Sequence, residues 1–272
     1  MKHYKLMLGL AIVLSLITSC KKHDYPPHGE VWQLSKVQRS SLEYRYDNQH
    51  RLTNINRVPW GFGPNFQITT DQLGRPLTLK DSISPGSPDQ FIYQYGKLTG
   101  ISGSQTTPTT FTYDSKGRII RKDGNANYYS YVIYEYEGNS RNFKRASFFS
   151  NSATARATSE PAADVIIEYT RDNKINPYST IANSNVIPFF FAEYMGPTFY
   201  DPVVPNNSVK EEYFGRVDTG YFKFMEHQYT YVYENDYPTT FTFQYISYSF
   251  PNGTPSYAPP QPGGYTYNKW HY

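Results

Sequence analysis

The sequence predicts an all-β fold, an antiparallel meander of hairpins that forms a curved open sheet or an incomplete barrel, with one long loop or short-helix excursion. The first observation is the aromatic content, 28 Tyr and 17 Phe in a chain that is 38% hydrophobic. Such rings suit pleated, half-buried strands. The second is a repeated turn signal, and the third is the lack of a long helical periodicity after position 20. Together they favour roughly a dozen to sixteen strands.

Residues 1–19 precede this fold and have the pattern of a lipoprotein signal peptide. A short cationic start is followed by an apolar run over residues 6–17, which is too short for the roughly 20 residues of a membrane-spanning helix. Ile17, Thr18 and Ser19 then lead to Cys20, the only cysteine. This pattern predicts cleavage before Cys20 and lipidation of its thiol. An ordinary secretory signal with a coincidental cysteine is the alternative.

Residues 20–37 are interpreted as a flexible tether between the lipid and the domain, because they contain Pro26, Pro27 and Gly29. Residues 38–272 are interpreted as a single β domain. With its one thiol consumed by lipid, this domain has no disulfide and no cysteine metal site. Packing and backbone pairing therefore have to hold it together.

A degenerate hairpin repeat fills the first half of that domain. An aromatic or polar strand ends in a short turn, and a second strand follows, so that each repeat supplies one hairpin. The repeats cover residues 44–55, 69–77, 93–101, 111–120 and 134–139.

The turn residues have a clear chemical role. Asp114 can accept hydrogen bonds from the backbone ahead of it, and Gly117 supplies the positive φ of a hairpin turn that ends in a bulge. Asp71 begins the same arrangement, whereas His50 replaces the glycine after Asp47 and predicts a looser turn. An arginine follows each of these turns, placed to pair with the aspartate.

Three stretches interrupt the pattern. Residues 151–163 are rich in Ser, Thr and Ala and predict a polar loop. Residues 177–208 contain five prolines and an apolar run, and they predict a long excursion with at most a short helix that covers one face or end of the sheet. Residues 251–264 predict coil, and residues 265–272 a final strand.

These motifs resemble the YD repeats of RHS-type proteins, and more closely a group of uncharacterised Bacteroidetes lipoproteins that carry degenerate YD-like hairpins. The resemblance covers roughly residues 38–250, including the run Tyr229 to Thr239. It implies a hairpin fold and a cell envelope location. It implies no activity, because the group is a domain of unknown function.

No catalytic, cofactor or metal site is predicted. The sequence contains no P-loop, no G-x-G-x-x-G, no G-x-S-x-G and no H-E-x-x-H. None of its histidines has an acidic residue at ligand spacing on a predicted shared face. Removing Lys2 and Lys5 with the signal peptide leaves 24 basic against 23 acidic residues, so nucleic acid is not an expected partner.

Paired carboxylates are the one catalytic alternative, since glycoside hydrolysis needs two. The turn aspartates recur at one structural position, which indicates a structural role. Glu135 and Glu137, and the adjacent pair Glu211 and Glu212, are interpreted as solvated strand residues. A glycan-active hydrolase is therefore the secondary hypothesis.

The feature with most functional promise is a row of rings. Tyr229, Tyr231 and Tyr233 lie on one face of one predicted strand, because side chains alternate. Exposed rings in a row can stack on sugar rings. The alternative is cross-strand packing that holds the sheet together.

From these observations we predict a non-enzymatic protein of the cell envelope, attached to the outer membrane through lipid on Cys20, in either leaflet. Its tyrosine-rich β surface would bind a glycan or another envelope protein, with a purely structural subunit as a further alternative. A transmembrane barrel is disfavoured, because a lipid anchor makes it redundant and the strands lack a continuous outward apolar band.

Replacing the lipidated residue tests the anchor directly. In the variant Cys20→Ser, the thiol that would receive the lipid is absent, so the protein is expected in the soluble fraction or as an unprocessed precursor. Membrane fractionation and the mass of the mature N-terminus measure this. Fractionation identical to that of the unmodified sequence would contradict the assignment.

Overall fold

The computed structural model describes residues 30–39, 41–57, 65–82, 86–103, 108–124, 129–150, 162–181, 203–218 and 220–271. The chain divides into two compact units. The smaller consists of Met1–Trp32 and Lys269–Tyr272, and in its described part the Lys269 ammonium lies 3.8 Å from the centre of the Trp32 ring. The larger unit, Gln33–Asn268, contains nearly all of the sheet.

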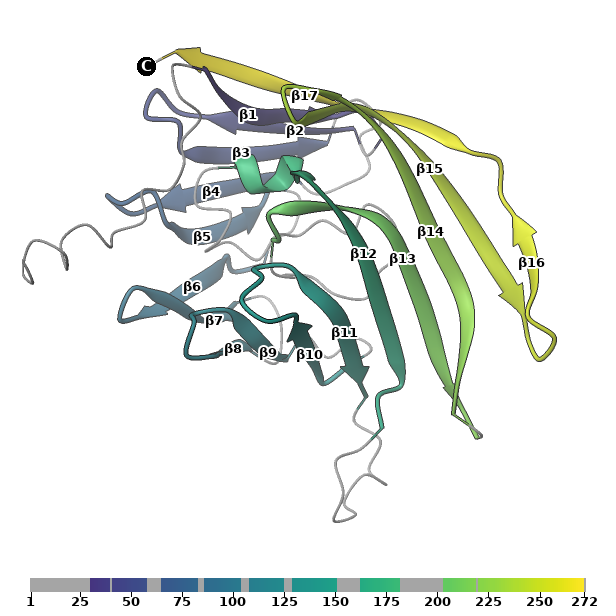
Figure 1. Ribbon diagram of the computed structural model, residues 1–272. Coiled ribbons are helices and arrows are strands. Elements are labelled where there is room, and N and C mark those ends of the chain that lie inside the picture. Colours follow the sequence, from purple (N-terminus) through teal and green to yellow (C-terminus); the bar gives the residue numbers. More distant parts are fainter. Residues whose placement is uncertain are drawn as a thin grey trace, which may run out of the picture. The chain divides into compact units, whose positions relative to one another are not determined.

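The described chain is almost entirely antiparallel β structure (Figure 1). From β1 to β16 each strand pairs with the next along the sequence, as hairpin repeats require, whereas β17 pairs with β15. The strands are β1 (Glu30–Val37), β2 (Leu42–Tyr46), β3 (Leu52–Arg57), β4 (Phe66–Thr70), β5 (Pro76–Asp81), β6 (Asp89–Gln94), β7 (Lys97–Ser102), β8 (Thr109–Tyr113), β9 (Ile119–Asp123), β10 (Tyr131–Tyr136), β11 (Phe143–Phe149), β12 (Val165–Ile175), β13 (Asn206–Val217), β14 (Gly220–Glu234), β15 (Tyr237–Ser249), β16 (Thr254–Tyr257) and β17 (Gln261–His271).

The sheet closes into a barrel, so the predicted open sheet or incomplete barrel is wrong. β17 pairs with both β15 and β1, which joins the last strand to the first, and β16 is added to β15 outside this ring of sixteen strands. At the closure, Gly264 lies opposite Thr240 of β15 and its carbonyl accepts a 2.8 Å hydrogen bond from the Gln38 backbone N–H. Closure removes the unpaired edges that an open sheet would expose.

The error came from the proline- and glycine-rich segment before the last strand. It was predicted to be coil as far as residue 264, but β17 begins at Gln261. The glycines allow a close approach here, since a Cβ on Gly263 would lie 2.2 Å from the Phe241 ring and one on Gly264 would lie 2.8 Å from the Gln38 side chain. They mark a tight contact between strands and not a loop.

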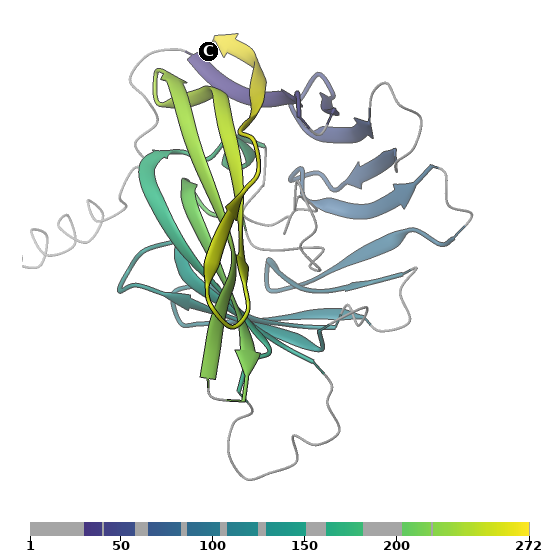
Figure 2. The same cartoon turned by 90° about the vertical axis from the view of Figure 1, so that its right-hand side faces the viewer.

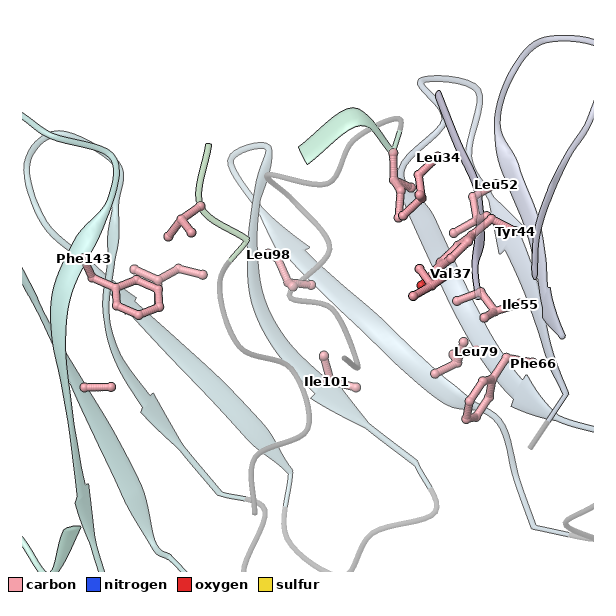
Figure 3. Packing of buried hydrophobic residues seen from close by; sticks show 14 of the residues in the cluster. Leu34, Val37, Tyr44, Leu52, Ile55, Phe66, Leu79, Leu98, Ile101 and Phe143 are labelled. Carbon is pink, nitrogen blue, oxygen red and sulfur yellow. The ribbon is translucent and has the colours of Figure 1, made fainter. Parts of the chain in front are cut away.

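The strands have a buried inner face and an exposed face. On β4, Phe66 and Ile68 are buried while Gln67 and Thr69 between them are exposed. The same alternation recurs along β8. Figure 3 shows buried side chains of the inner face, such as Leu34, Tyr44 and Leu52, packed against one another. The inner face therefore forms the hydrophobic core of the barrel.

The exposed face is polar. Large apolar side chains on it are scattered, as with Leu77, Ile92 and Val232. The remaining exposed strand positions are mostly Thr, Gln and charged residues, among them Arg45, Gln67, Thr69, Lys80, Gln90, Thr110, Thr112, Lys144, Gln228, Thr230 and Thr242. This face is suited to contact with water.

The predicted turn chemistry is confirmed in detail. One oxygen of Asp114 accepts hydrogen bonds of 2.9 Å from the backbone N–H groups of Lys116 and Arg118, and its other oxygen accepts one of 2.7 Å from Arg118 Nε. These bonds lower the pKa of the Asp114 carboxyl. Gly117 has φ +76°, and a register shift beside Tyr113 shows the expected bulge.

The turn that lacks the glycine is as well formed as the others. His50 itself takes φ +60°, and its N–H donates a 3.0 Å bond to the Asp47 carbonyl, as Gly117 does to Asp114. The prediction of a looser turn at this position was therefore wrong. The aspartate bonds hold the backbone closed even with a side chain in the left-handed region.

Neighbouring hairpins are linked by a tyrosine at or near the end of a first strand, as with Tyr136 and Tyr93. The Tyr136 hydroxyl donates a 2.8 Å bond to the carbonyl of Ile119, the residue directly after Arg118, and the Arg118 guanidinium lies 4.4 Å from the centre of the Tyr136 ring. Tyr93 makes the same two contacts with Pro76 and Arg75. Burial raises the pKa of the Tyr136 hydroxyl to about 12, so the hydroxyl remains a donor. We call this arrangement the tyrosine link.

The predicted tether and excursion are described only in part. Residues 30–37 of the tether form β1, whereas residues 20–29 lie outside the described part. Pro177–Thr180 form a short 3-10 helix, η1, at the start of the predicted excursion, and residues 182–202 and 151–161 are not described. None of the described helical residues belongs to a helix long and apolar enough to cross a membrane. In Figure 2 the long strands of the C-terminal half, in green and yellow, lie at the front of the view.

The turn glycines give a stability prediction. Gly117 and Gly74 hold φ values of +76° and +75°, which β-branched side chains resist. Replacing either with valine is expected to lower the free energy of unfolding by roughly 1–3 kcal/mol. The exposed Ser115 in the same turn is the control, and Ser115→Val is expected to be nearly neutral. Equal, small effects at all three positions in urea titrations would contradict this account of the turns.

Candidate functional site

The three tyrosines singled out in the sequence form a row on the inner face of β14. The Tyr229 and Tyr231 rings are stacked, with centres 6.0 Å apart and planes at 11°, and Tyr233 follows at 5.8 Å. All three rings are half-buried. Across the row, β15 places Phe243 opposite Tyr229 and Phe241 opposite Tyr231.

Hydrogen bonds fix the orientation of the row. The Tyr231 hydroxyl donates a 3.0 Å bond to the Ser208 carbonyl of β13, and the Tyr233 hydroxyl donates to the Asp172 carboxylate of β12. Rings held in this way offer a rigid aromatic surface, with no side-chain freedom to lose when a ligand binds. Whether they contact a ligand stays a prediction.

A polar group lies at one end of this row. Glu211 and Tyr213 alternate on β13, and His227 lies directly opposite Glu211 on β14. One Glu211 oxygen accepts a 2.9 Å bond from the Tyr213 hydroxyl and lies 3.2 Å from His227 Nδ1. His227 is 6% exposed, so the pair is enclosed by the barrel wall.

The charge state of the Glu211 carboxyl follows from these contacts. Burial by itself raises its pKa, but hydrogen bonding and charge attraction from His227, with the Tyr213 bond, lower the pKa below the ordinary value. Glu211 is therefore ionised at neutral pH. A His227 ring that donates from Nδ1 to this carboxylate has the arrangement by which a carboxylate orients a histidine.

Arg171 completes the group from β12. Tyr169 and Arg171 alternate on that strand, and Tyr169 lies directly opposite Glu211. The Arg171 guanidinium lies 4.7 Å from the centre of the Tyr169 ring. We call Arg171, Glu211, Tyr213 and His227 the inner-wall cluster.

The sequence interpretation missed this cluster. Glu211 was taken for a solvated strand residue, which is wrong, because it is enclosed beside His227. For His227 no acidic residue was predicted at ligand spacing on its own face, and the glutamate that it meets belongs to another strand. A signal was present, because His227 continues the alternation of Tyr229 and Tyr231 by one step and so shares their face. The contact with Glu211 depends on the register between β13 and β14, which the sequence does not show.

The structure also bears on the predicted lipidation, metal and carboxylate sites. Cys20 lies outside the described residues. Within the described part of the chain, no three His, Cys, Asp or Glu side chains are placed to hold a metal ion. Glu135 and Glu168 lie on the exposed face, where Arg145 pairs with both.

No protein-family model matches the sequence, and no curated protein matches it either. A solved structure with a similar fold is that of a porin-like protein from Bacteroides uniformis ATCC 8492. The two share 13% sequence identity with a TM-score of 0.50, over 89% of this chain and 97% of the other. At this identity the likeness concerns the fold, and it agrees with a closed antiparallel barrel.

Removing the charge of Glu211 tests the cluster. A carboxyl with a lowered pKa in the folded state stabilises the fold above its unfolded pKa of about 4.3, and this stabilisation is lost as the pH falls through the folded pKa. Glu211→Gln is expected to lower the free energy of unfolding by about 1–3 kcal/mol near pH 7 and by less in acid.

The matched control is Glu168→Gln on the exposed face, where the glutamate side chain is 41% exposed. Its effect is expected to stay below about 0.5 kcal/mol. Urea titrations at neutral and acid pH measure both variants. A Glu211→Gln effect that is the same at both pH values would contradict the charge assignment.

Proposed function

We propose that this protein is a non-enzymatic glycan-binding protein of the cell envelope, held at the outer membrane by lipid on Cys20. The observation that supports it best is the polarity of the barrel wall, with rings and buried charge inside and polar side chains outside. The proposal also rests on the signal-peptide pattern and on the resemblance to YD-repeat lipoproteins. The similar solved structure is named porin-like, which agrees with an envelope barrel.

The polarity argues against insertion of the barrel itself into a bilayer. A transmembrane barrel has an outward apolar band about 25 Å tall and a polar interior. Here the exposed positions of β4 and β8 are Gln67, Thr69, Thr110 and Thr112, while their inward neighbours are the buried core. Burying such a polar face in hydrocarbon would be costly. A barrel that stands in water needs a separate anchor to stay at a membrane, and Cys20 would provide it.

The tyrosine row supports a sugar ligand. Stacked, half-buried rings present a flat apolar surface to the C–H face of a sugar, and the adjacent cluster offers hydrogen-bonding groups for its hydroxyls. Such a site binds by contact with several rings in succession. We therefore propose that Tyr229, Tyr231 and Tyr233 form the binding surface.

Hydrolysis is less well supported. Two carboxylates touch the row, Glu211 through His227 and Asp172 through Tyr233. Glu211 lies opposite Tyr169 of β12, and Asp172 follows Tyr169 by three residues on that strand. A glycosidase needs one carboxyl group with a raised pKa as its general acid. The pKa of Glu211 is lowered instead, which favours binding over catalysis.

A polysaccharide screen followed by substitution of the row tests the proposal. For any glycan that binds, alanine at Tyr229, Tyr231 or Tyr233 is expected to weaken the affinity by roughly 2- to 10-fold each, because one stacking contact is lost. Calorimetry or affinity electrophoresis measures this. Tyr231→Phe, which keeps the ring, is expected to retain most of the affinity.

Tyr95 supplies the second control, since this turn residue is fully exposed and distant from the row in the strand order. Tyr95→Ala should bind as the unmodified protein does. If no glycan binds the folded barrel, or if the three alanine variants bind normally, the rings are packing residues and the proposal fails.

A further inference from the structure

Arg171 differs from the turn arginines of the barrel in its hydrogen-bond partners. Arg51, Arg75 and Arg118 each lie 2.7 Å from their turn aspartate. Arg171 instead donates to neutral acceptors. Its Nη1 donates to Ser208 Oγ at 2.9 Å and to the Asn206 carbonyl at 3.4 Å, and its Nε donates to the Phe143 carbonyl at 3.3 Å.

The remaining donors of this guanidinium are unused within the described chain. An arginine has five N–H groups, and the three bonds above account for those on Nε and Nη1. Nη2 makes no hydrogen bond to any described residue. Glu211 attracts Arg171 from beyond ion-pair distance, and its hydrogen-bonding oxygen is already engaged by Tyr213 and His227.

The surroundings make a cation costly when no anion among the described residues forms an ion pair with it. Burial lowers the pKa of the Arg171 guanidinium, and attraction from neighbouring groups only partly offsets this. The rings of Tyr169 and Phe143 pack against it, with centres at 4.7 and 4.9 Å. A buried cation is ordinarily compensated by an anion. A guanidinium between two rings is also well suited to a planar carboxylate.

Arg171 lies beside the tyrosine row. Its Nη1 and the Tyr231 hydroxyl both bind Ser208, the first at the side chain and the second at the carbonyl. A sugar stacked on Tyr229 and Tyr231 would therefore present its substituents close to the guanidinium. We propose that Arg171 binds the carboxylate of an acidic sugar, so that the barrel selects uronic-acid-containing glycans over neutral ones.

This inference rests on the proposed glycan-binding function, and a pair of ligands separates the two. Oligogalacturonate and its methyl ester share the same sugar rings, but only the first carries free carboxylates. The lipid-free Cys20→Ser protein is expected to bind the acid about tenfold or more tightly than the ester, because one charge-assisted contact is added. Calorimetry at one salt concentration measures both.

Three variants assign the preference to Arg171. Arg171→Gln is expected to bind acid and ester equally, within about twofold. Arg171→Lys keeps the charge but loses the planar fork, and an intermediate preference is expected. Arg145→Gln, which breaks an ion pair with Glu168 on the exposed face, is the matched control and should keep the full preference. Near-UV circular dichroism of the tyrosines verifies folding.

The outcomes are distinct. Equal binding of acid and ester by the unmodified site, or a preference that survives in Arg171→Gln, overturns the acidic-sugar inference while the binding function stands. The first of these comparisons needs no substitution at Arg171, so a variant that fails to fold does not block the test. Absence of binding to both ligands and to every neutral glycan overturns the inference together with the proposed function.

Discussion

The tyrosine link is the interaction on which the barrel wall depends. It joins the ring and hydroxyl of one hairpin to the arginine and the following carbonyl of the hairpin before it, as with Tyr136, Arg118 and Ile119. The same arginine is fixed by the turn aspartate. One short motif therefore shapes its own turn and sets its position against its neighbour. The second repeat carries Thr70 in place of the tyrosine and cannot make this contact.

The polarity of the wall follows from the alternation of side chains along each strand. Each link directs a tyrosine inward, so every second strand position is committed to the interior, and the positions between are left for water. A closed sheet of sixteen strands is a shape that membrane proteins also use. The Gln, Thr and charged residues on the exposed face are the basis for proposing that this barrel faces water. The interior in turn gains room for buried polar groups such as Glu211 and Arg171.

Local chemistry could be predicted from the sequence, and long-range pairing could not. Asp114 and Gly117 act within one turn, so their residue types and spacing were sufficient to predict its hydrogen bonds. Closure depends on the hydrogen bond between Gln38 and Gly264. The pair Gly263 and Gly264 predicts a loop when the strand that packs against it is unknown. The inner-wall cluster has the same origin, because Glu211 and His227 meet only through the register of two long strands. The tyrosine row could be predicted because all three of its residues lie on a single strand.

Closure at β17 also determines the order in which the barrel can assemble. Hairpins close short loops and form quickly, whereas the contact between Gln38 and Gly264 brings together residues far apart in sequence and is entropically the slowest to form. Until β17 is in place, β1 and β15 each present a free hydrogen-bonding edge to other chains. The edges of such a half-built wall are open to pairing with another copy. Aggregation during folding is thus a hazard of this topology until the last strand has paired.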